Sequence, residues 1–148
     1  MTIGFDTNLF IYSFDRTNPA KRTRARDLLV RILPQQPRVP LQLICETLNA
    51  AQRKRHLILA DAREACILLS ETLDIIPSTV GDAVEASLLA ERFKLQFFDA
   101  QIITVSIRSG ITVLLSEDMQ DGLSIGALTV LDPFNSANDA RINRLLED

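Results

Sequence analysis

The sequence has few of the residues on which several common kinds of site depend. Its 148 residues include two cysteines, one histidine and no tryptophan. Cys45 and Cys66 belong to no CxxC pair, so a zinc site of the Cys/His type cannot be assembled from them and His56. One histidine also gives little support for a histidine-based triad. Any demanding catalysis by this chain must therefore rest mainly on carboxylates.

Long apolar runs are absent as well. The longest charge-free segment, residues 122–131, is ten residues long, whereas a membrane-spanning helix needs about twenty. Asp6 and Asn8 interrupt the first apolar stretch, and no basic residues precede it, so we expect neither a secretory signal nor a membrane span. Two unpaired thiols fit a reducing compartment, and we expect a cytoplasmic protein.

The composition is that of a globular protein, with 47% hydrophobic and 24% charged residues. No repeat, low-complexity tract or Gly/Ser linker interrupts the chain. We therefore expect a single domain over residues 1–148, with residues 135–148 as a C-terminal tail or short helix.

Charge is distributed unevenly along the chain. Residues 1–63 contain eleven Lys or Arg and five Asp or Glu, whereas residues 64–148 contain five and fourteen. A local positive field can attract a polyanion although the net charge is −3. The residues that we expect to guide a nucleic-acid backbone are Lys21, Arg22, Arg24, Arg53, Lys54 and Arg55. The alternative is that these residues only form solvated helix faces.

Short apolar strands are expected to alternate with longer helices. The expected strands are residues 2–5, 38–40, 75–76, 111–115 and 128–131. The expected helices are residues 7–14, 19–33, 41–55, 60–73, 79–93 and 98–109. This alternation predicts an α/β fold, a three-layer α/β/α sandwich with a central parallel sheet. In such sheets, ligands bind at the carboxyl ends of the strands.

Local signals predict several helix ends. Asn18 before Pro19 is a typical N-cap followed by proline at the first helical position. Thr79 and Asp82 have the spacing of a capping box. Gly110 is the expected glycine just beyond the helix that ends near Ser109.

Four carboxylates stand beside apolar residues. Asp6 follows the first strand, Glu46 lies inside a helix, Asp99 begins a helix and Asp118 follows the strand of residues 111–115. Each alone has a structural explanation, namely an Asx-turn for Asp6, an ion pair for Glu46 or a favourable helix dipole for Asp99. Acids in such surroundings are seldom fully buried unless they are paired or bind a metal.

Convergence of these carboxylates would require protons or cations to offset their repulsion. All-oxygen ligands favour hard cations, Mg²⁺ or Mn²⁺. A cation of this kind suits phosphodiester hydrolysis, because it lowers the pKa of a bound water and stabilises the leaving oxygen. No side-chain nucleophile is then needed, which fits the composition.

Five segments, taken in order, resemble those of PIN-domain ribonucleases, and in particular the VapC-type toxins of bacterial toxin–antitoxin pairs. They are FDTNLFIY at residues 5–12, LQLICETLN at 41–49, FDAQII at 98–103, LLSEDMQDG at 114–122 and LTVLDPF at 128–134. The resemblance covers about residues 2–134. It departs from the family at Phe98, where the family often has tryptophan.

The resemblance implies a divalent-metal-dependent endoribonuclease with a PIN-like fold. It assigns Asp6, Glu46, Asp99 and Asp118 to the catalytic site. Asp6, Asp99 and Asp118 would hold Mg²⁺ or Mn²⁺, while Glu46 would orient or deprotonate the attacking water. Supporting roles are expected for Thr7, Asn8, Ser116 and Asp121. The implied partners are an RNA substrate such as tRNA, a cognate antitoxin and a second copy of the chain in a homodimer.

Other functions are open to a chain of this pattern. A haloacid-dehalogenase-type phosphatase needs a second aspartate two residues after the first, but Asn8 stands there. A receiver domain needs a lysine after its last strand, whereas the lysines are Lys21, Lys54 and Lys94. A PIN nuclease of RNA processing and a PIN-like interaction module without catalysis both remain compatible with the sequence.

Overall fold

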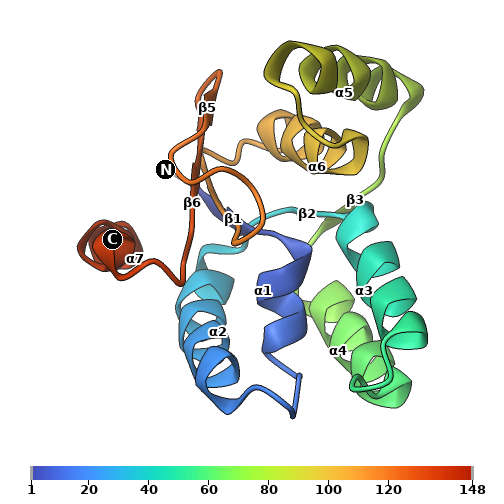
Figure 1. Cartoon of the computed structure of the whole chain (residues 1–148), viewed down its shortest axis with the longest axis vertical. Coiled ribbons are helices and arrows are strands. Elements are labelled where there is room, and N and C mark those ends of the chain that lie inside the picture. The colour runs from blue at the N-terminus through green and yellow to red at the C-terminus, as the bar shows by residue number, and fades with distance from the viewer. Residues whose placement is uncertain (1, 148) are drawn as a thin grey trace.

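The computed structural model describes residues 2–147, in which short strands alternate with helices (Figure 1). The strands are β1 (Ile3–Phe5), β2 (Val39–Pro40), β3 (Ile75–Ile76), β4 (Val113–Leu115), β5 (Ser124–Ile125) and β6 (Leu128–Leu131). The α-helices are α1 (Thr7–Tyr12), α2 (Pro19–Ile32), α3 (Leu41–Arg53), α4 (Leu59–Thr72), α5 (Val80–Phe93), α6 (Phe97–Arg108) and α7 (Asp139–Leu146). Short 3₁₀ turns occupy Leu33–Gln35 and Ser136–Asn138.

The main sheet has the strand order β1-β4-β6-β5. β4 pairs in parallel with both β1 and β6, and β5 adds an antiparallel edge strand to β6. Phe5 is opposite Leu115 in this register, so the chain leaves β1 and β4 at the same edge of the sheet. β2 and β3 form a separate parallel pair.

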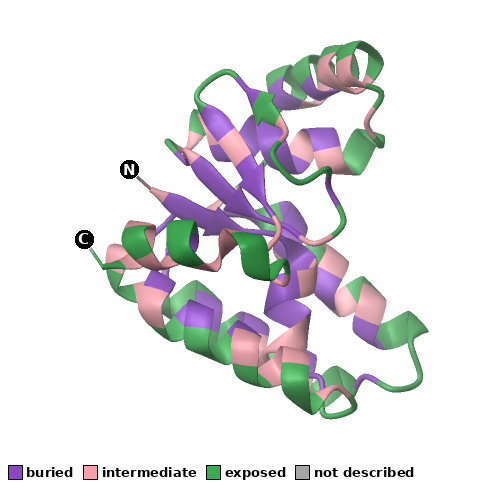
Figure 2. Cartoon of the chain, turned by 60° about the vertical axis from the view of Figure 1, so that its left-hand side comes forward, coloured by how far each residue is buried: buried purple, intermediate pink, exposed green. Residues whose placement is uncertain are grey.

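Helices cover both faces of this sheet. In Figure 1, α5 and α6 lie on one side of the strands, while α1, α2, α3 and α4 lie on the other. Figure 2 shows the strands as a buried layer between these two groups. Leu114 packs into the core beneath α5 and α6, whereas its neighbours Val113 and Leu115 pack into the core on the opposite face. This alternation is expected for strands that are buried on both sides.

The predicted three-layer fold is confirmed, with one correction to the sheet. The sequence predicts a parallel sheet and no strand at residues 124–125, whereas the structure has the antiparallel strand β5 there. All the predicted strands and helices are present, with ends displaced by up to two residues. The capping box of Thr79 and Asp82 is formed, and Gly110 has the positive φ of a residue after a helix. At the C-terminal end of the described chain, residues 139–146 form α7.

Among residues 2–147, every helix is too short or too polar to cross a lipid bilayer.

Candidate active site

Asp6 stands where β1 ends and α1 begins. Its N–H donates to Leu115 O at 2.9 Å, which extends the pairing of β1 with β4 by one residue. Its Oδ1 accepts from the Thr7 N–H at 2.7 Å and caps α1, and its Oδ2 accepts from Ser116 Oγ at 2.9 Å. Sheet register and helix capping therefore fix both oxygens of Asp6.

Burial makes the charge of Asp6 costly. The side chain is only 6% exposed. Burial, together with the smaller effects of the charges of Asp99 and Glu46, raises the pKa of Asp6 to about 6, although the hydrogen bonds from Thr7 and Ser116 lower it. A carboxylate in these surroundings gains from a nearby cation.

Glu46 reaches the same place from α3. Its Oε2 accepts from Thr7 Oγ1 at 2.8 Å, and its Oε1 accepts from Gln42 Nε2 at 2.5 Å. Gln42 is one turn earlier on the same helix, so both side chains lie on one helix face. The first turn of α1 is thereby connected to the middle of α3.

Gln42 also connects α3 to α6. Its Nε2 donates to Phe98 O at 2.8 Å, and its Oε1 accepts from Gln101 Nε2 at 2.8 Å. Asp99, between these two partners, lies in the first turn of α6. Burial raises the pKa of Asp99, and the charges of Glu46 and Asp118 raise it further. Asp99 is therefore close enough to both acids to feel their repulsion.

Asp118 completes the group from the loop between β4 and β5, residues 116–123, which we call the β4–β5 loop. Its Oδ2 accepts from Asn8 Nδ2. Asp118 is exposed and Asp6 is buried, so the group of acids extends from the core to the surface.

The structure brings together the four predicted acids and three of the predicted supports. Thr7, Asn8 and Ser116 each donate a hydrogen bond to one of the acids. Besides burial, the charges of neighbouring carboxylates raise the pKa of Asp6 and of Asp99, so the four acids form one group, which we call the acidic site. Its members are Asp6, Glu46, Asp99 and Asp118.

Asp121, the fourth predicted support, makes different contacts. Its oxygens accept from the Asp132 N–H at 3.0 Å, Asn135 Nδ2 at 2.9 Å and Asn138 Nδ2 at 3.0 Å. The Asp132 N–H is the main reason that the pKa of Asp121 is lowered. These bonds connect the β4–β5 loop to the segment that leads into α7.

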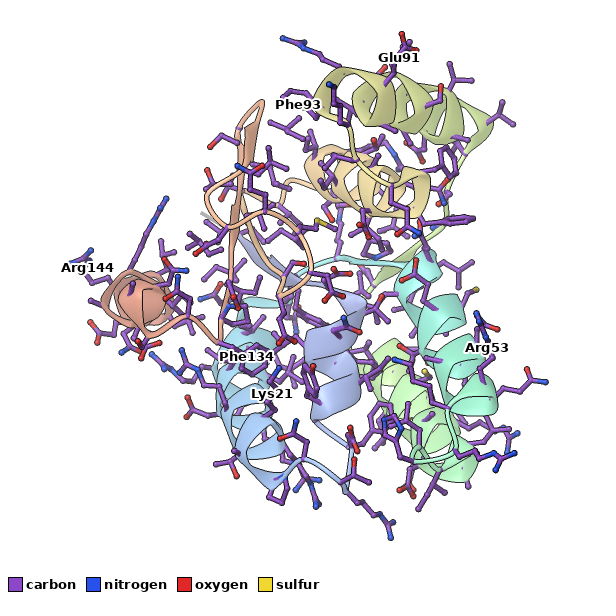
Figure 3. The ribbon with its side chains drawn as sticks, viewed as in Figure 1. Lys21, Arg53, Glu91, Phe93, Phe134 and Arg144 are labelled. Carbon is purple, nitrogen blue, oxygen red and sulfur yellow. The ribbon has the colours of Figure 1, made fainter. Side chains whose placement is uncertain are left out.

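The predicted basic residues are in different environments. Lys21 forms an ion pair with Glu117, and Arg24 binds Asp139 at 2.9 Å and Pro133 O at 3.1 Å. Arg53 and Lys54 line a pocket of about 310 Å³ that also includes Glu46, and Figure 3 shows Arg53 projecting from α3. Arg55 is exposed and Arg22 is partly buried.

Gln42 and Gln101 are residues of the site that the sequence does not predict. Gln42 is almost fully buried, and it uses both amide hydrogens and its oxygen in bonds around the acidic site. The only signal for it in the sequence is its place one helical turn before Glu46. A glutamine at that spacing is common on helix surfaces and does not by itself indicate a site.

The donor set of the acidic site fits a hard divalent cation. Every candidate ligand atom is a carboxylate oxygen, and burial and repulsion disfavour the charged forms of Asp6 and Asp99. Within residues 2–147, no three acidic, thiol or imidazole side chains stand as a ready-made ligand cluster. Asp6, Glu46 and Asp118 instead accept hydrogen bonds from Thr7, Ser116, Gln42 and Asn8.

The fold is similar to those of three solved toxin or toxin–antitoxin structures, each less than 25% identical to this chain. A toxin–antitoxin complex from Klebsiella pneumoniae matches with a TM-score of 0.65 and 22% identity, covering 90% of this chain and 98% of that one. VapC20 of Mycobacterium tuberculosis, described as a sarcin-ricin loop cleaving toxin, matches with 0.64 and 19%, covering 79% and 92%. VapBC2 of Rickettsia felis, bound to a promoter DNA fragment, matches with 0.62 and 13%, covering 88% and 97%.

Comparison with curated proteins gives no match. The family model of the PIN domain matches residues 3–120, which include all four acids of the site. The chain therefore belongs to the PIN domain family.

Proposed function

We propose that this chain is a divalent-metal-dependent endoribonuclease and the toxin of a VapBC-type toxin–antitoxin system. The observation that carries the proposal is the gathering of four carboxylates from separate parts of the chain into one acidic site. The hydrogen bonds of Thr7 and Ser116 and the repulsion among the acids support it. The likeness to VapC20 and to two toxin–antitoxin structures supports the toxin role.

In this proposal, Asp6, Asp99 and Asp118 hold Mg²⁺ or Mn²⁺. When bound, the cation supplies Lewis-acid stabilisation of the phosphate and lowers the pKa of a water molecule. Glu46 orients the attacking water or accepts its proton. Ser116 and Asn8 keep the carboxylates of Asp6 and Asp118 in place.

We place the binding of the RNA at the pocket beside Glu46. Arg53 and Lys54 line it together with Glu46 itself, so a backbone phosphate held there would be next to the acidic site. Arg55 extends the same basic end of α3. We also propose that an antitoxin inhibits the protein and that the chain acts as a homodimer, as the resemblance to VapC-type toxins implies.

Inducible expression tests the proposed function in cells. Wild type and Asp6→Asn would be expressed in a bacterial host, and the 5′ ends of cleaved RNA would be mapped. Wild type should arrest growth and produce new 5′ ends at defined sites, and Asp6→Asn should produce neither. Equal cleavage by both proteins at matched expression would remove Asp6 from the catalytic site.

Purified protein tests the metal requirement. RNA cleavage by wild type should need Mg²⁺ or Mn²⁺ and stop in EDTA, and Asp118→Asn should be inactive at any metal concentration. A PIN-like module without catalysis would show no cleavage in either protein. Full cleavage by a folded Asp118→Asn protein would refute the metal assignment.

A further inference from the structure

A second charged cluster lies next to the acidic site and has no part in the chemistry described above. Lys21 of α2 donates to Glu117 Oε1 in the β4–β5 loop and to the Tyr12 hydroxyl at 3.2 Å. Its ammonium group is 4.7 Å from the ring centroid of Tyr12 and 4.9 Å from that of Phe134. Figure 3 shows Lys21 and Phe134 beside each other. We call this group the Lys21 cluster.

The surroundings of Lys21 make this ion pair stronger than an ordinary surface pair. The Tyr12 and Phe134 rings meet edge to face at 5.3 Å, and both attract the ammonium group. The side chains of Lys21 and Glu117 are 30% and 24% exposed, so water screens their charges only in part. Burial opposes the charge of Lys21, but Glu117 and Tyr12 outweigh burial and raise its pKa.

The position of Glu117 in the chain gives the cluster its importance. Glu117 stands between Ser116, which donates to Asp6, and Asp118, which accepts from Asn8. The loop begins directly after β4 with Ser116, whose N–H donates to Leu131 O at 3.0 Å. Holding the side chain of Glu117 therefore restricts the backbone that carries both neighbours.

We propose that Lys21 is a positioning residue: its contacts with Glu117, Tyr12 and Phe134 fix the β4–β5 loop so that Ser116 and Asp118 keep their places in the acidic site. This inference rests on the proposed metal-dependent nuclease function. It differs from the role expected for Lys21 from the sequence, which is a direct contact with the RNA backbone. Because its ammonium group is already paired with Glu117, Lys21 is a weak partner for a phosphate.

The two roles predict different kinetics for Lys21→Met. Loss of positioning should lower kcat and weaken Mn²⁺ binding by about 10- to 100-fold, which is the usual effect of removing a support of a metal site. KM for RNA and its salt dependence should stay unchanged. Lys21→Arg should restore most of kcat, because arginine can still pair with Glu117. Lys94→Met, at an exposed lysine after α5, is the matched control and should behave as wild type.

Hydrogen exchange of the metal-free protein gives a readout that does not depend on activity. The amides of the β4–β5 loop should exchange at least about tenfold faster in Lys21→Met than in Lys94→Met, because the loop loses a tertiary restraint. Glu117→Gln should show the same change, and it serves as a second variant if Lys21→Met does not fold. Circular dichroism would show that each variant is folded.

Two outcomes overturn the inference. A raised KM and a flatter salt dependence, with kcat and Mn²⁺ affinity unchanged, would make Lys21 an RNA contact. If hydrogen exchange of the β4–β5 loop is unchanged in both Lys21→Met and Glu117→Gln, Lys21 has no positioning role. If wild type neither cleaves RNA nor binds Mn²⁺, the proposed function fails, and the exchange experiment still decides whether Lys21 holds the loop.

Discussion

Asp6 shows at the scale of one residue how a site can cost stability. Its carboxylate is buried, and burial raises its pKa from 3.8 to about 6. Between these two pH values the folded chain binds more protons than the unfolded chain. The free energy of unfolding contributed by Asp6 therefore falls as the pH rises through this range and stays low above it.

Asp6→Asn should stabilise the metal-free protein at pH 7.5 for this reason. Asparagine keeps the acceptor that caps α1 and carries no charge. A shift from 3.8 to about 6 corresponds to at most about 3 kcal/mol. Urea unfolding should show this gain at pH 7.5 and a much smaller gain at pH 4.5, where the wild-type carboxyl is protonated. Asp74→Asn, at an exposed aspartate, should show no gain; a loss of stability in Asp6→Asn at both pH values would contradict the account.

The sequence predicts the acids of the site better than it predicts their hydrogen-bond partners. Asp6, Ser116 and Asp118 follow strands, and parallel strands bring such residues to one edge of the sheet. Gln42 and Gln101 meet only because β2, which precedes α3, lies against α6. A contact between helices that are far apart in sequence leaves no local pattern, so these two residues could not be predicted.

At the scale of one element, α5 depends on the residues that begin it. Thr79 Oγ1 accepts from the Asp82 N–H at 3.1 Å, and Asp82 Oδ2 accepts from the Thr79 N–H at 2.9 Å. Arg108 of α6 donates to both oxygens of Asp82, at 2.9 and 2.7 Å, and is the main reason that the pKa of Asp82 is lowered. The cap of α5 is thus also its attachment to α6.

Thr79→Ala should lower the free energy of unfolding at pH 7 by about 1 kcal/mol, the usual loss for an N-cap. Ser87→Ala, at an exposed serine of the same helix, should change it by less than about 0.5 kcal/mol.

The depressed pKa of Asp82 stabilises the fold above pH 3.8, and this contribution is lost as the pH falls further. The advantage of wild type over Asp82→Asn should therefore shrink below pH 3.8 in urea unfolding; an advantage that grows there would contradict the assignment.

Asp121 should act on the C-terminal segment and not on the metal. Its bonds to Asn135, Asn138 and the Asp132 N–H hold the residues that lead into α7. Asp121→Ala should speed hydrogen exchange in residues 133–146 and leave Mn²⁺ affinity within about twofold of wild type, because its oxygens are already used. A loss of affinity as large as that of Asp118→Asn would instead place Asp121 in the acidic site, as the resemblance implies.

The longer elements could be predicted from the sequence, and the shortest could not. Helices of 14 residues carry enough signals to be recognised, namely apolar spacing in α4 and capping residues in α2 and α5. β5 has two residues, Ser124 and Ile125, too few for an alternating pattern. Its antiparallel pairing comes from the turn at Gly126, whose φ is +57°. The separate pairing of β2 with β3 could not be predicted either, because these strands are equally short.

At the scale of the whole molecule, the uneven distribution of charge indicates which side of the protein RNA would approach. Arg53 and Lys54 end α3 beside Glu46, on the side of the sheet opposite α5 (Figure 1). In the proposed function, these two cations would hold phosphates while the acids would hold the metal. The net charge of −3 does not prevent this, because screening confines each field to about 10 Å at 0.1 M salt.

Removal of both cations should make RNA binding less sensitive to salt. In EDTA, where cleavage is blocked, the plot of log affinity against log salt should become less steep by about 1.4 for Arg53→Gln with Lys54→Gln, since each single-strand contact contributes about 0.7. Arg92→Gln with Lys94→Gln on the α5 side is the control and should leave the slope unchanged. Equal slopes for both pairs would exclude Arg53 and Lys54 from the RNA-binding surface.

In the proposed function, the four carboxylates form one site for a divalent cation. Calorimetric titration of the metal-free protein with Mn²⁺ tests this site in wild type and in the variants Asp6→Asn, Asp99→Asn and Asp118→Asn. Wild type should bind Mn²⁺, and each aspartate variant should bind at least about tenfold more weakly while remaining folded by circular dichroism. Mn²⁺ binding by folded Asp99→Asn and Asp118→Asn with the affinity of wild type would contradict the account.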